Sequence, residues 1–324
     1  MTKASLVLMC VSAFSVASCS SDDDQEPLNT GPSYFTATYD VILNSMGVDS
    51  EKYADATALG SLQNPNLTQA SGLAVSRRAE GLLWSHNDSG DMNRIFLLGS
   101  DGSNRGIFRV LGSGNRDWED MAIGDGPEPG VPYLYIGDFG DNNKVYSEIY
   151  IYRFPEPDPA TADTSLQWRN VGPEGVDQIT LKYPDGPRDA ESLLLDPLTL
   201  DLYIVTKSDF PARIYRLEYP YEHGESYTLE LYGTLPVTLV TGGAISADGK
   251  KILLKTKERI WLWSRTTDES LADAFMRAPE RVPYLPEPQG EAIAFLPDDY
   301  SYYTLSERGA SSLPPVVYFY ERLR

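Results

Sequence analysis

Short apolar segments recur along the chain at intervals of about fifty residues, and the first residue of each is polar. Five such segments begin at Ser71, Glu119, Glu191, Thr241 and Glu291, so their first positions are 48, 72, 50 and 50 residues apart. Segments this short and apolar suit buried strands better than helices. A repeat of this length predicts modules that stack in a line or surround an axis.

Each segment is followed by two further runs rich in aromatic and β-branched residues, a composition typical of strands. The second runs lie at 82–84, 133–136, 202–205, 252–254 and 302–305, and the third runs at 94–97, 148–153, 213–217, 259–263 and 316–320. Turn dipeptides such as Asp196-Pro197 and Asp248-Gly249 separate the first run from the second. These residues are typical of short hairpins. The repeat is therefore predicted to be a meander of antiparallel strands.

A fourth strand is predicted in the first four repeats, at 106–110, 178–183, 227–231 and, from a weaker pattern, 274–276. The fifth repeat ends after its third strand, so its fourth strand should come from the N-terminal part, either 34–39 or 57–59. Four-stranded modules arranged radially are propeller blades, and closing the ring with both termini protects the sheet edges. The extra length of the second repeat, 155–176, is interpreted as an insertion on the outer face.

The sequence thus predicts an all-β fold, a β-propeller whose last blade is closed by N-terminal strand material. Five blades is the direct count of the repeats. Six is the alternative, because residues 31–70 have room for a degenerate blade. We assign residues 34–324 to a single propeller domain.

The N-terminus has the features of an export signal. Lys3 precedes an apolar run that is too short to span a bilayer but fits a signal peptide, here 1–18. Val16-Ala17-Ser18-Cys19 resembles the lipobox of bacterial lipoproteins, which implies acylation of Cys19. Residues 19–33 form an acidic tether that resembles the surface-export signals of Bacteroidetes lipoproteins, or that serves only as a solvated linker. We expect an exported protein that is lipid-anchored through Cys19 to the outer membrane or cell surface.

Composition excludes several kinds of chemistry. A net charge of −20 argues against nucleic acid as a partner, because phosphate backbones are repelled. If Cys10 leaves with the signal and Cys19 is acylated, no thiol remains for a disulfide, a nucleophile or a metal site. Two histidines are too few for a three-histidine zinc site, and the chain has no Gly-x-Ser-x-Gly motif and no phosphate-binding glycine loop.

Polar residues are predicted to meet at one mouth of the propeller channel. In a blade, the start of the first strand and the end of the second lie on the same face, because the hairpin runs down and returns. The predicted pairs around the ring are Ser71 with His86 and Asp88, Glu119 with Asp138, Glu191 with Lys207, Thr241 with Lys257, and Glu291 with Glu307. The string Asp-x-Gly-Asp-x-Asn occurs at both 88–93 and 138–143, where we favour turn formation over ligand binding.

The negative charge of this ring is predicted to be uneven. Lys207 and Lys257 supply cations in the third and fourth blades, whereas the fifth, first and second blades concentrate Glu291, Glu307, Asp88, Glu119 and Asp138. Carboxylates about 6 Å apart repel by about 3 kcal/mol at an effective dielectric near 20. A hard cation, here Ca²⁺, would offset that repulsion, because oxygen-only ligands select such ions. The predicted ligands are Glu119 and Glu291, with help from Asp88 or Asp138.

Two alternatives remain at this point. In the first, a glutamate of the ring, Glu119, Glu191 or Glu291, has a raised pKa of the kind that makes a general acid. Otherwise the ring only plugs the channel, and Arg308 or His86 supplies the counter-charge.

Three segments resemble the acidic elements of calcium-dependent phytase-like and SdiA-regulated-type propellers. They are 117–122, 189–193 and 289–294, in each of which a glutamate precedes an apolar strand. The resemblance spans most of residues 70–324. It implies Ca²⁺ ligation by Glu119, Glu191 and Glu291, and in some members phosphoesterase or esterase activity. Five repeats instead of the usual six, and Ser71 and Thr241 in place of acids, are departures that put catalysis in doubt.

Three functions are therefore open: a Ca²⁺-assisted hydrolase of a phosphoester or ester, a glycan-active enzyme with paired carboxylates, and a non-catalytic propeller that binds a glycan or a protein. Fold alone does not choose among them. The ligand class, whether small molecule, glycan or protein, and the enzyme status stay open.

The anchor prediction can be tested by replacing Cys19 with Ser. We expect the variant to leave the membrane fraction, because stable anchoring relies on several acyl chains. Fractionation followed by immunoblotting measures this. A Cys19→Ser protein that stays membrane-bound in high salt would rule out lipid anchoring at Cys19.

Overall fold

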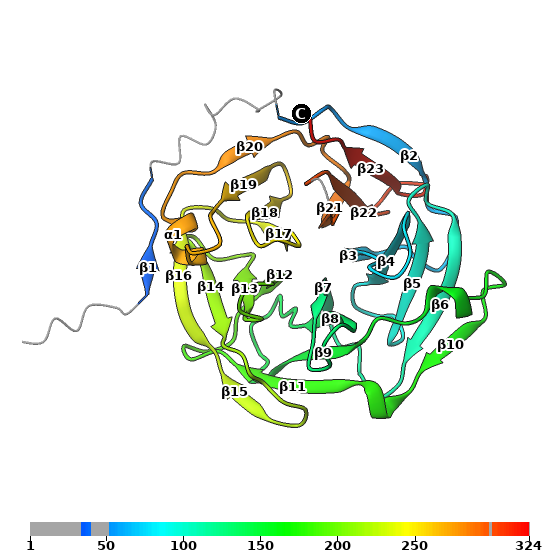
Figure 1. The fold of residues 1–324 in the computed structure, drawn as a ribbon, viewed down its shortest axis with the longest axis horizontal. Coiled ribbons are helices and arrows are strands. Elements are labelled where there is room, and N and C mark those ends of the chain that lie inside the picture. Colours follow the sequence, from blue (N-terminus) through cyan, green and yellow to red (C-terminus); the bar gives the residue numbers. More distant parts are fainter. Residues whose placement is uncertain (1–33, 40–51, 298–299, 324) are drawn as a thin grey trace, which may run out of the picture. The chain divides into compact units, whose positions relative to one another are not determined.

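Five β-sheets surround a common axis, and the three inner strands of each follow one another in the sequence as an antiparallel meander (Figure 1). The computed structural model describes residues 34–39, 52–297 and 300–323. The predicted signal peptide, the tether and Cys19 lie outside the described residues. Among the residues that are described, no helix has the length and apolar character needed to cross a bilayer.

The blades follow one another in sequence order. Blade 1 consists of β3 (Ala70–Val75), β4 (Leu82–Asn87), β5 (Arg94–Gly99) and β6 (Asn104–Val110). Blade 2 consists of β7 (Trp118–Asp125), β8 (Pro132–Asp138), β9 (Ile149–Pro155) and β11 (Asp177–Lys182). Blade 3 consists of β12 (Ala190–Leu195), β13 (Leu202–Thr206), β14 (Ala212–Leu217) and β16 (Glu230–Leu235).

Blade 4 consists of β17 (Val240–Ile245), β18 (Lys251–Thr256), β19 (Ile260–Ser264) and β20 (Glu280–Val282). Blade 5 consists of β21 (Gln289–Phe295), β22 (Tyr302–Glu307), β23 (Val316–Tyr320) and β2 (Thr57–Ser61). The predicted β-propeller with five blades is therefore confirmed, and the described residues contain no sixth blade.

The ring closes as the repeat count requires. Strand β2 pairs antiparallel with β23, so the N-terminal strand completes the blade that ends the chain. Of the two segments considered for this role, 57–59 is correct and 34–39 is wrong. The latter contributes β1 (Phe35–Thr36), which pairs parallel with β16 at the edge of blade 3.

Two of the predicted fourth strands are wrong in detail. The run 227–231 is divided between β15 (Ser226–Thr228), which joins the edge of blade 2, and β16. The run 274–276 overlaps helix α1 (Leu271–Phe275), and β20 takes the strand position instead. The helix forms because Ser270 and Asp273 make a reciprocal capping box, in which the Ser270 Oγ accepts from the Asp273 N–H at 3.1 Å.

The predicted insertion 155–176 lies at the outer edge of a sheet. Within it, β10 (Trp168–Val171) pairs parallel with β6 as a fifth strand of blade 1. Strands β10, β15 and β1 thus cover the outer edges of the first three blades, which leaves less strand edge open to aggregation.

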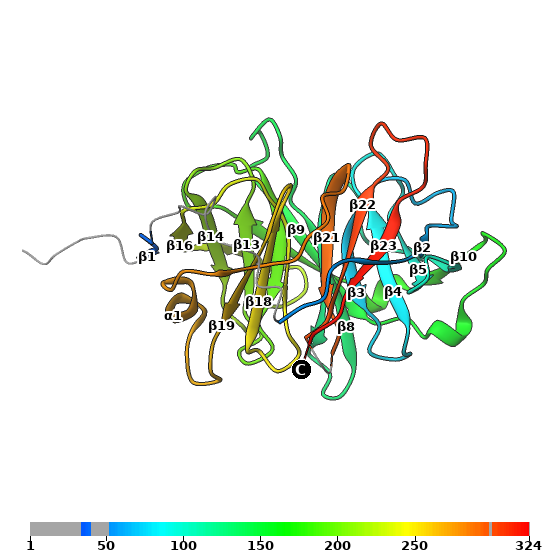
Figure 2. The same ribbon diagram turned by 90° about the horizontal axis from the view of Figure 1, so that it is seen from above.

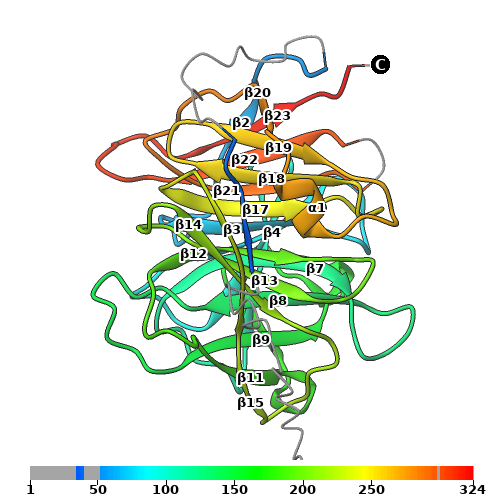
Figure 3. The same ribbon diagram turned by 90° about the vertical axis from the view of Figure 1, so that its left-hand side faces the viewer.

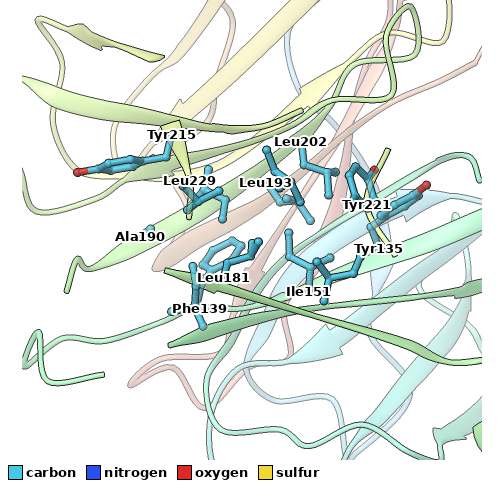
Figure 4. Close-up of a cluster of buried hydrophobic side chains, with 14 of the residues drawn as sticks. Tyr135, Phe139, Ile151, Leu181, Ala190, Leu193, Leu202, Tyr215, Tyr221 and Leu229 are labelled. Atoms are coloured by element: carbon cyan, nitrogen blue, oxygen red, sulfur yellow. The ribbon is translucent and has the colours of Figure 1, made fainter. Parts of the chain in front are cut away.

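The core lies between the faces of neighbouring sheets, which pack against each other around the ring (Figures 2 and 3). Between blades 2 and 3, Ile151 and Leu181 of one sheet meet Leu193 and Leu202 of the other (Figure 4). All four side chains are buried. At the axis the inner strands leave a cavity of only about 50 Å³, which residues from all five of them line.

A buried carboxylate ties three inner strands together at the axis. The Asp120 Oδ2 accepts hydrogen bonds from the backbone N–H of Leu193 in blade 3, at 2.9 Å, and of Gly243 in blade 4, at 3.2 Å. Its Oδ1 accepts from the Met121 N–H at 2.8 Å. One side chain of blade 2 therefore satisfies backbone donors of three blades.

Asp120→Asn tests this link. The amide can present only one acceptor oxygen, so at least one buried N–H loses its partner, and we expect a loss of about 1–3 kcal/mol in unfolding free energy. Urea denaturation measures the loss. Asp125→Asn, at the exposed end of the same strand, is the control and should be near neutral. Equal stability of the two variants would show that Asp120 does not hold the ring.

Candidate functional site

Each inner strand begins with the same irregularity. The pairing of the first two strands shifts register at one place in every blade: between residues 70 and 73, 118 and 120, 190 and 192, 240 and 242, and 290 and 292. These β-bulges fall on the five polar first positions of the repeat. A bulge re-aims a side chain and interrupts the ladder. Side chains along a strand point alternately to its two faces, and the bulge interrupts this alternation at the polar residue that starts each apolar run.

Carboxyl groups of three neighbouring blades meet beside these bulges. Asp88, Glu291 and Glu307 form one group, and Asp88, Asp117 and Glu119 form another. Within each group, one oxygen from every residue lies within 4.8 Å of the others. Asp88 belongs to both groups and connects them. The acids gather where blades 5, 1 and 2 adjoin, the side on which the sequence places uncompensated charge.

Burial and mutual repulsion raise the pKa of these carboxyl groups. Burial raises the pKa of Glu307 to about 8, with further contributions from Glu291 and Asp88. Burial and the Asp88 charge raise the pKa of Asp117 to about 7. Glu119 is buried deepest in the cluster, and burial followed by the charge of Asp88 holds its pKa well above the usual range. At neutral pH the cluster holds protons unless a cation replaces them.

The protons are unevenly divided within the cluster. A hydrogen bond from Asp117 lowers the pKa of Asp88, although burial raises it overall. In the same way, a hydrogen bond from Glu307 lowers the pKa of Glu291 against the larger effect of burial. Each of these two pairs therefore shares a proton through a hydrogen bond in which Asp117 or Glu307 is the donor.

The charge of Lys207 acts on several members of the cluster. Its Nζ makes an ion pair with Glu191, as the sequence-based pairing expects. Its charge also lowers the pKa of Glu119, Glu291 and Glu307, in each case against larger opposing effects. One ammonium that is already paired with Glu191 cannot neutralise the whole cluster.

Three of the other predicted residues lie outside the two groups. Asp138 holds a loop, because its Oδ1 accepts from the Asp117 N–H at 2.8 Å. His86 is fully buried with its ring edge-on to Trp118 at 5.5 Å, and burial lowers its pKa to about 4, so it is neutral. Lys257 is exposed, and its charge contributes to lowering the pKa of Glu291.

Arg308 follows Glu307 and is partly buried. Its backbone N–H donates to the Thr68 carbonyl at 2.9 Å. The second aspartates of the repeated string serve the turns: Asp91 pairs with Arg94 at 2.8 Å, and Asp141 accepts from the Tyr146 N–H at 2.7 Å.

Sequence reasoning missed Asp117 as a member of the cluster, as well as a buried pair beside it. Lys255 is fully buried in β18, where burial lowers its pKa to about 8. Burial raises the pKa of Glu287 to about 7, and the Lys255 charge opposes that rise. The sequence signal for this buried pair was Lys255, which directly follows the apolar run 252–254 within the same strand. For Asp117, the signal was its place two residues before Glu119.

The two groups have the dimensions of a cation site. Oxygen ligands lie 2.3–2.6 Å from Ca²⁺, so any two ligands of one ion are at most about 5 Å apart. Both groups meet this limit. All their donors are carboxylate oxygens, which suit Ca²⁺ or Mg²⁺ and not a soft metal.

No protein-family model matches the chain, and no curated protein is similar to it. Fold and site therefore define only a class, a five-bladed β-propeller with an acidic cluster where blades 5, 1 and 2 adjoin.

The raised pKa values predict a pH-dependent stability in the absence of cations. A carboxyl group whose pKa is higher in the folded than in the unfolded chain stabilises the fold at low pH, and this stability is lost as pH rises through the folded pKa. For Glu307 the window runs from about 4.5 to about 8. The slope is at most about 1.4 kcal/mol per pH unit for one such group, and it is smaller for the partly exposed Asp117.

We therefore expect the unfolding free energy in EDTA to fall between pH 5 and pH 8. Glu307→Gln should flatten this fall, whereas Glu128→Gln, exposed in the hairpin after β7, should leave it unchanged. Urea denaturation at each pH measures it. A wild-type stability that rises steadily over this range would contradict the assigned protonation.

Proposed function

We propose that the protein is an exported, lipid-anchored propeller that binds a divalent cation, Ca²⁺ first, in the acidic cluster. The observation that carries the proposal is the sharing of Asp88 by two three-carboxylate groups. Asp88 is placed to ligate a cation in either group, so it is the residue on which binding most depends. Glu119, Glu291 and Glu307 would complete the ligand set, together with Asp117.

Charge supports the same conclusion. Two ionised carboxylates about 5 Å apart repel by about 3 kcal/mol at an effective dielectric near 20. The cluster contains five carboxyl groups, and the nearby Lys207 is already paired with Glu191. Protons on Asp117 and Glu307 relieve this repulsion at low pH. A divalent cation would replace these protons, and it would relieve the repulsion above about pH 7 to 8, where Asp117 and Glu307 lose them. It would also supply the positive charge needed to hold an anionic or oxygen-rich ligand.

A second candidate function is Ca²⁺-assisted hydrolysis of an ester or phosphoester. The observation that favours it is the raised pKa of Glu307, about 8, which keeps a proton on this carboxyl group at neutral pH. Such hydrolysis needs a proton donor next to a cation that polarises the scissile group. In this case the cation would lie in the group of Asp88, Asp117 and Glu119, and Glu307 would be the proton donor and not a ligand. If hydrolysis occurs, Glu307→Gln should abolish turnover of p-nitrophenyl esters or phosphates and leave Ca²⁺ binding measurable.

Thermal unfolding with Ca²⁺ and with EDTA tests the cation site. Binding to the folded state alone adds about 2.7 kcal/mol at a hundredfold excess over Kd, so wild-type melts should differ clearly. In Asp88→Asn the two melts should coincide, because both groups lose a ligand. Asp125→Asn removes an acid outside the cluster and should keep the wild-type difference.

The Glu119→Gln/Glu291→Gln variant should behave like Asp88→Asn, since it removes one ligand from each group. Metal analysis must show that the EDTA samples are cation-free. Coinciding wild-type melts under that condition would contradict cation binding and favour a channel mouth that is only a structural plug.

A further inference from the structure

A second feature lies on blade 3, in the loop that follows Lys207. Phe210 exposes 73% of its surface, the largest exposed fraction among the large hydrophobic side chains that the structure describes. Leu239, which precedes β17, exposes 45%. Both residues line one groove of about 330 Å³, together with Lys257, Glu258 and Trp261. Phe210 also lines a second groove of about 290 Å³, with Tyr34 and Arg213. One aromatic ring thus borders two grooves.

The backbone around Phe210 is held firmly. The Lys207 carbonyl accepts from the Leu239 N–H at 2.8 Å, and the Ala212 N–H donates to the Val237 carbonyl at 3.0 Å. The Arg213 N–H donates to the Thr206 Oγ1 at 2.9 Å. Hydrogen bonds therefore fix the loop on both sides of the exposed ring. An apolar ring on a fixed loop loses little conformational freedom when a ligand covers it.

Leu239 has a backbone φ of 57°, in the left-handed region that residues with a Cβ rarely adopt. Strain of this kind persists only where the surrounding structure enforces it, and it is concentrated at functional positions. Here it keeps an apolar side chain at the groove, facing solvent. The exposed ring of Phe210 and the strained backbone of Leu239 therefore occur together at one groove.

The opposite wall of the first groove is polar. Lys257 and Glu258 are both exposed, and in the described part of the chain neither side chain makes an ion pair. Donors and acceptors are thus available opposite an aromatic face. This combination matches a sugar ring, which has an apolar C–H face and a rim of hydroxyl groups. The C–H face packs on the negatively polarised face of the aromatic ring, and the hydroxyl groups bond to the charged side chains.

We propose that the two grooves bind a neutral oligosaccharide that crosses the Phe210 ring. Two grooves that share the Phe210 ring suit a chain of sugar units better than a single sugar. The chain's net charge of −20 disfavours anionic glycans. None of the five carboxyl groups of the acidic cluster lines these grooves, so oligosaccharide binding does not depend on cation binding.

Affinity electrophoresis through gels that contain soluble starch, mixed-linkage β-glucan, galactomannan, xylan or dextran tests the proposal, with polygalacturonate as the anionic comparison. We expect at least one neutral polysaccharide to retard the wild-type protein. Phe210→Ala should weaken that binding at least tenfold, and Lys257→Ala several-fold from the opposite wall. Trp261 lies in the groove, so its fluorescence should change when the matching oligosaccharide is titrated.

Leu313→Ala is the matched control, because Leu313 is 72% exposed in a loop of blade 5 and lines neither groove. It should bind like the wild type, and so should Asp88→Asn, which separates this site from the cation site. The proposal is overturned if no neutral polysaccharide retards the wild type, if only polygalacturonate does, or if Phe210→Ala is retarded equally. A casein digest that changes the fluorescence when no glycan does would assign the grooves to peptides instead.

Discussion

Repulsion among buried carboxyl groups is the constraint on which the candidate site depends. The starts of the inner strands and the ends of the second strands bring acids of blades 5, 1 and 2 within a few ångströms, and burial removes the water that would screen them. Three ways of relieving this are visible: protons on Asp117 and Glu307, the ammonium of Lys207, and room for a cation at carboxylate oxygens. The first two are partial, because the protons leave near neutral pH and Lys207 is shared with Glu191.

The cluster is held by strands, which makes it rigid. Every inner strand starts with a bulge that turns one polar residue out of the ladder, and the strands are tied to each other across blades. The Ser71 hydroxyl donates to the Glu119 carbonyl of the next blade, and the Thr241 hydroxyl donates to the Gly290 carbonyl. With Asp120 at the axis, these bonds prevent the acids from moving apart. Sites preorganised in this way keep their geometry at the expense of stability.

The five-bladed fold and part of the acidic cluster could be predicted, because the inner strands carry the repeated sequence pattern. Their apolar runs are buried on both faces, so the pattern is strong, and the polar first residue marks the bulge that points Glu119 and Glu291 to the cluster. The outer strands are short and half exposed, so a local signal such as the Ser270 capping box prevailed over the weak strand pattern at 274–276. Asp117 and Lys255 were missed because neither is the first residue of an inner strand or the last residue of a second strand. The Asp138 carboxylate accepts hydrogen bonds from backbone N–H groups, which the spacing of residues along the sequence does not reveal.

A crystal structure at neutral pH, grown with Ca²⁺ and then with Mn²⁺ for its anomalous signal, tests the central claim most directly. We predict an anomalous peak whose distance to oxygens of Asp88, and of the other carboxylates of at least one of the two groups, is that of a bound divalent ion, about 2.0–2.6 Å. A cluster filled only by water, or by the Lys207 ammonium, at millimolar cation would contradict it.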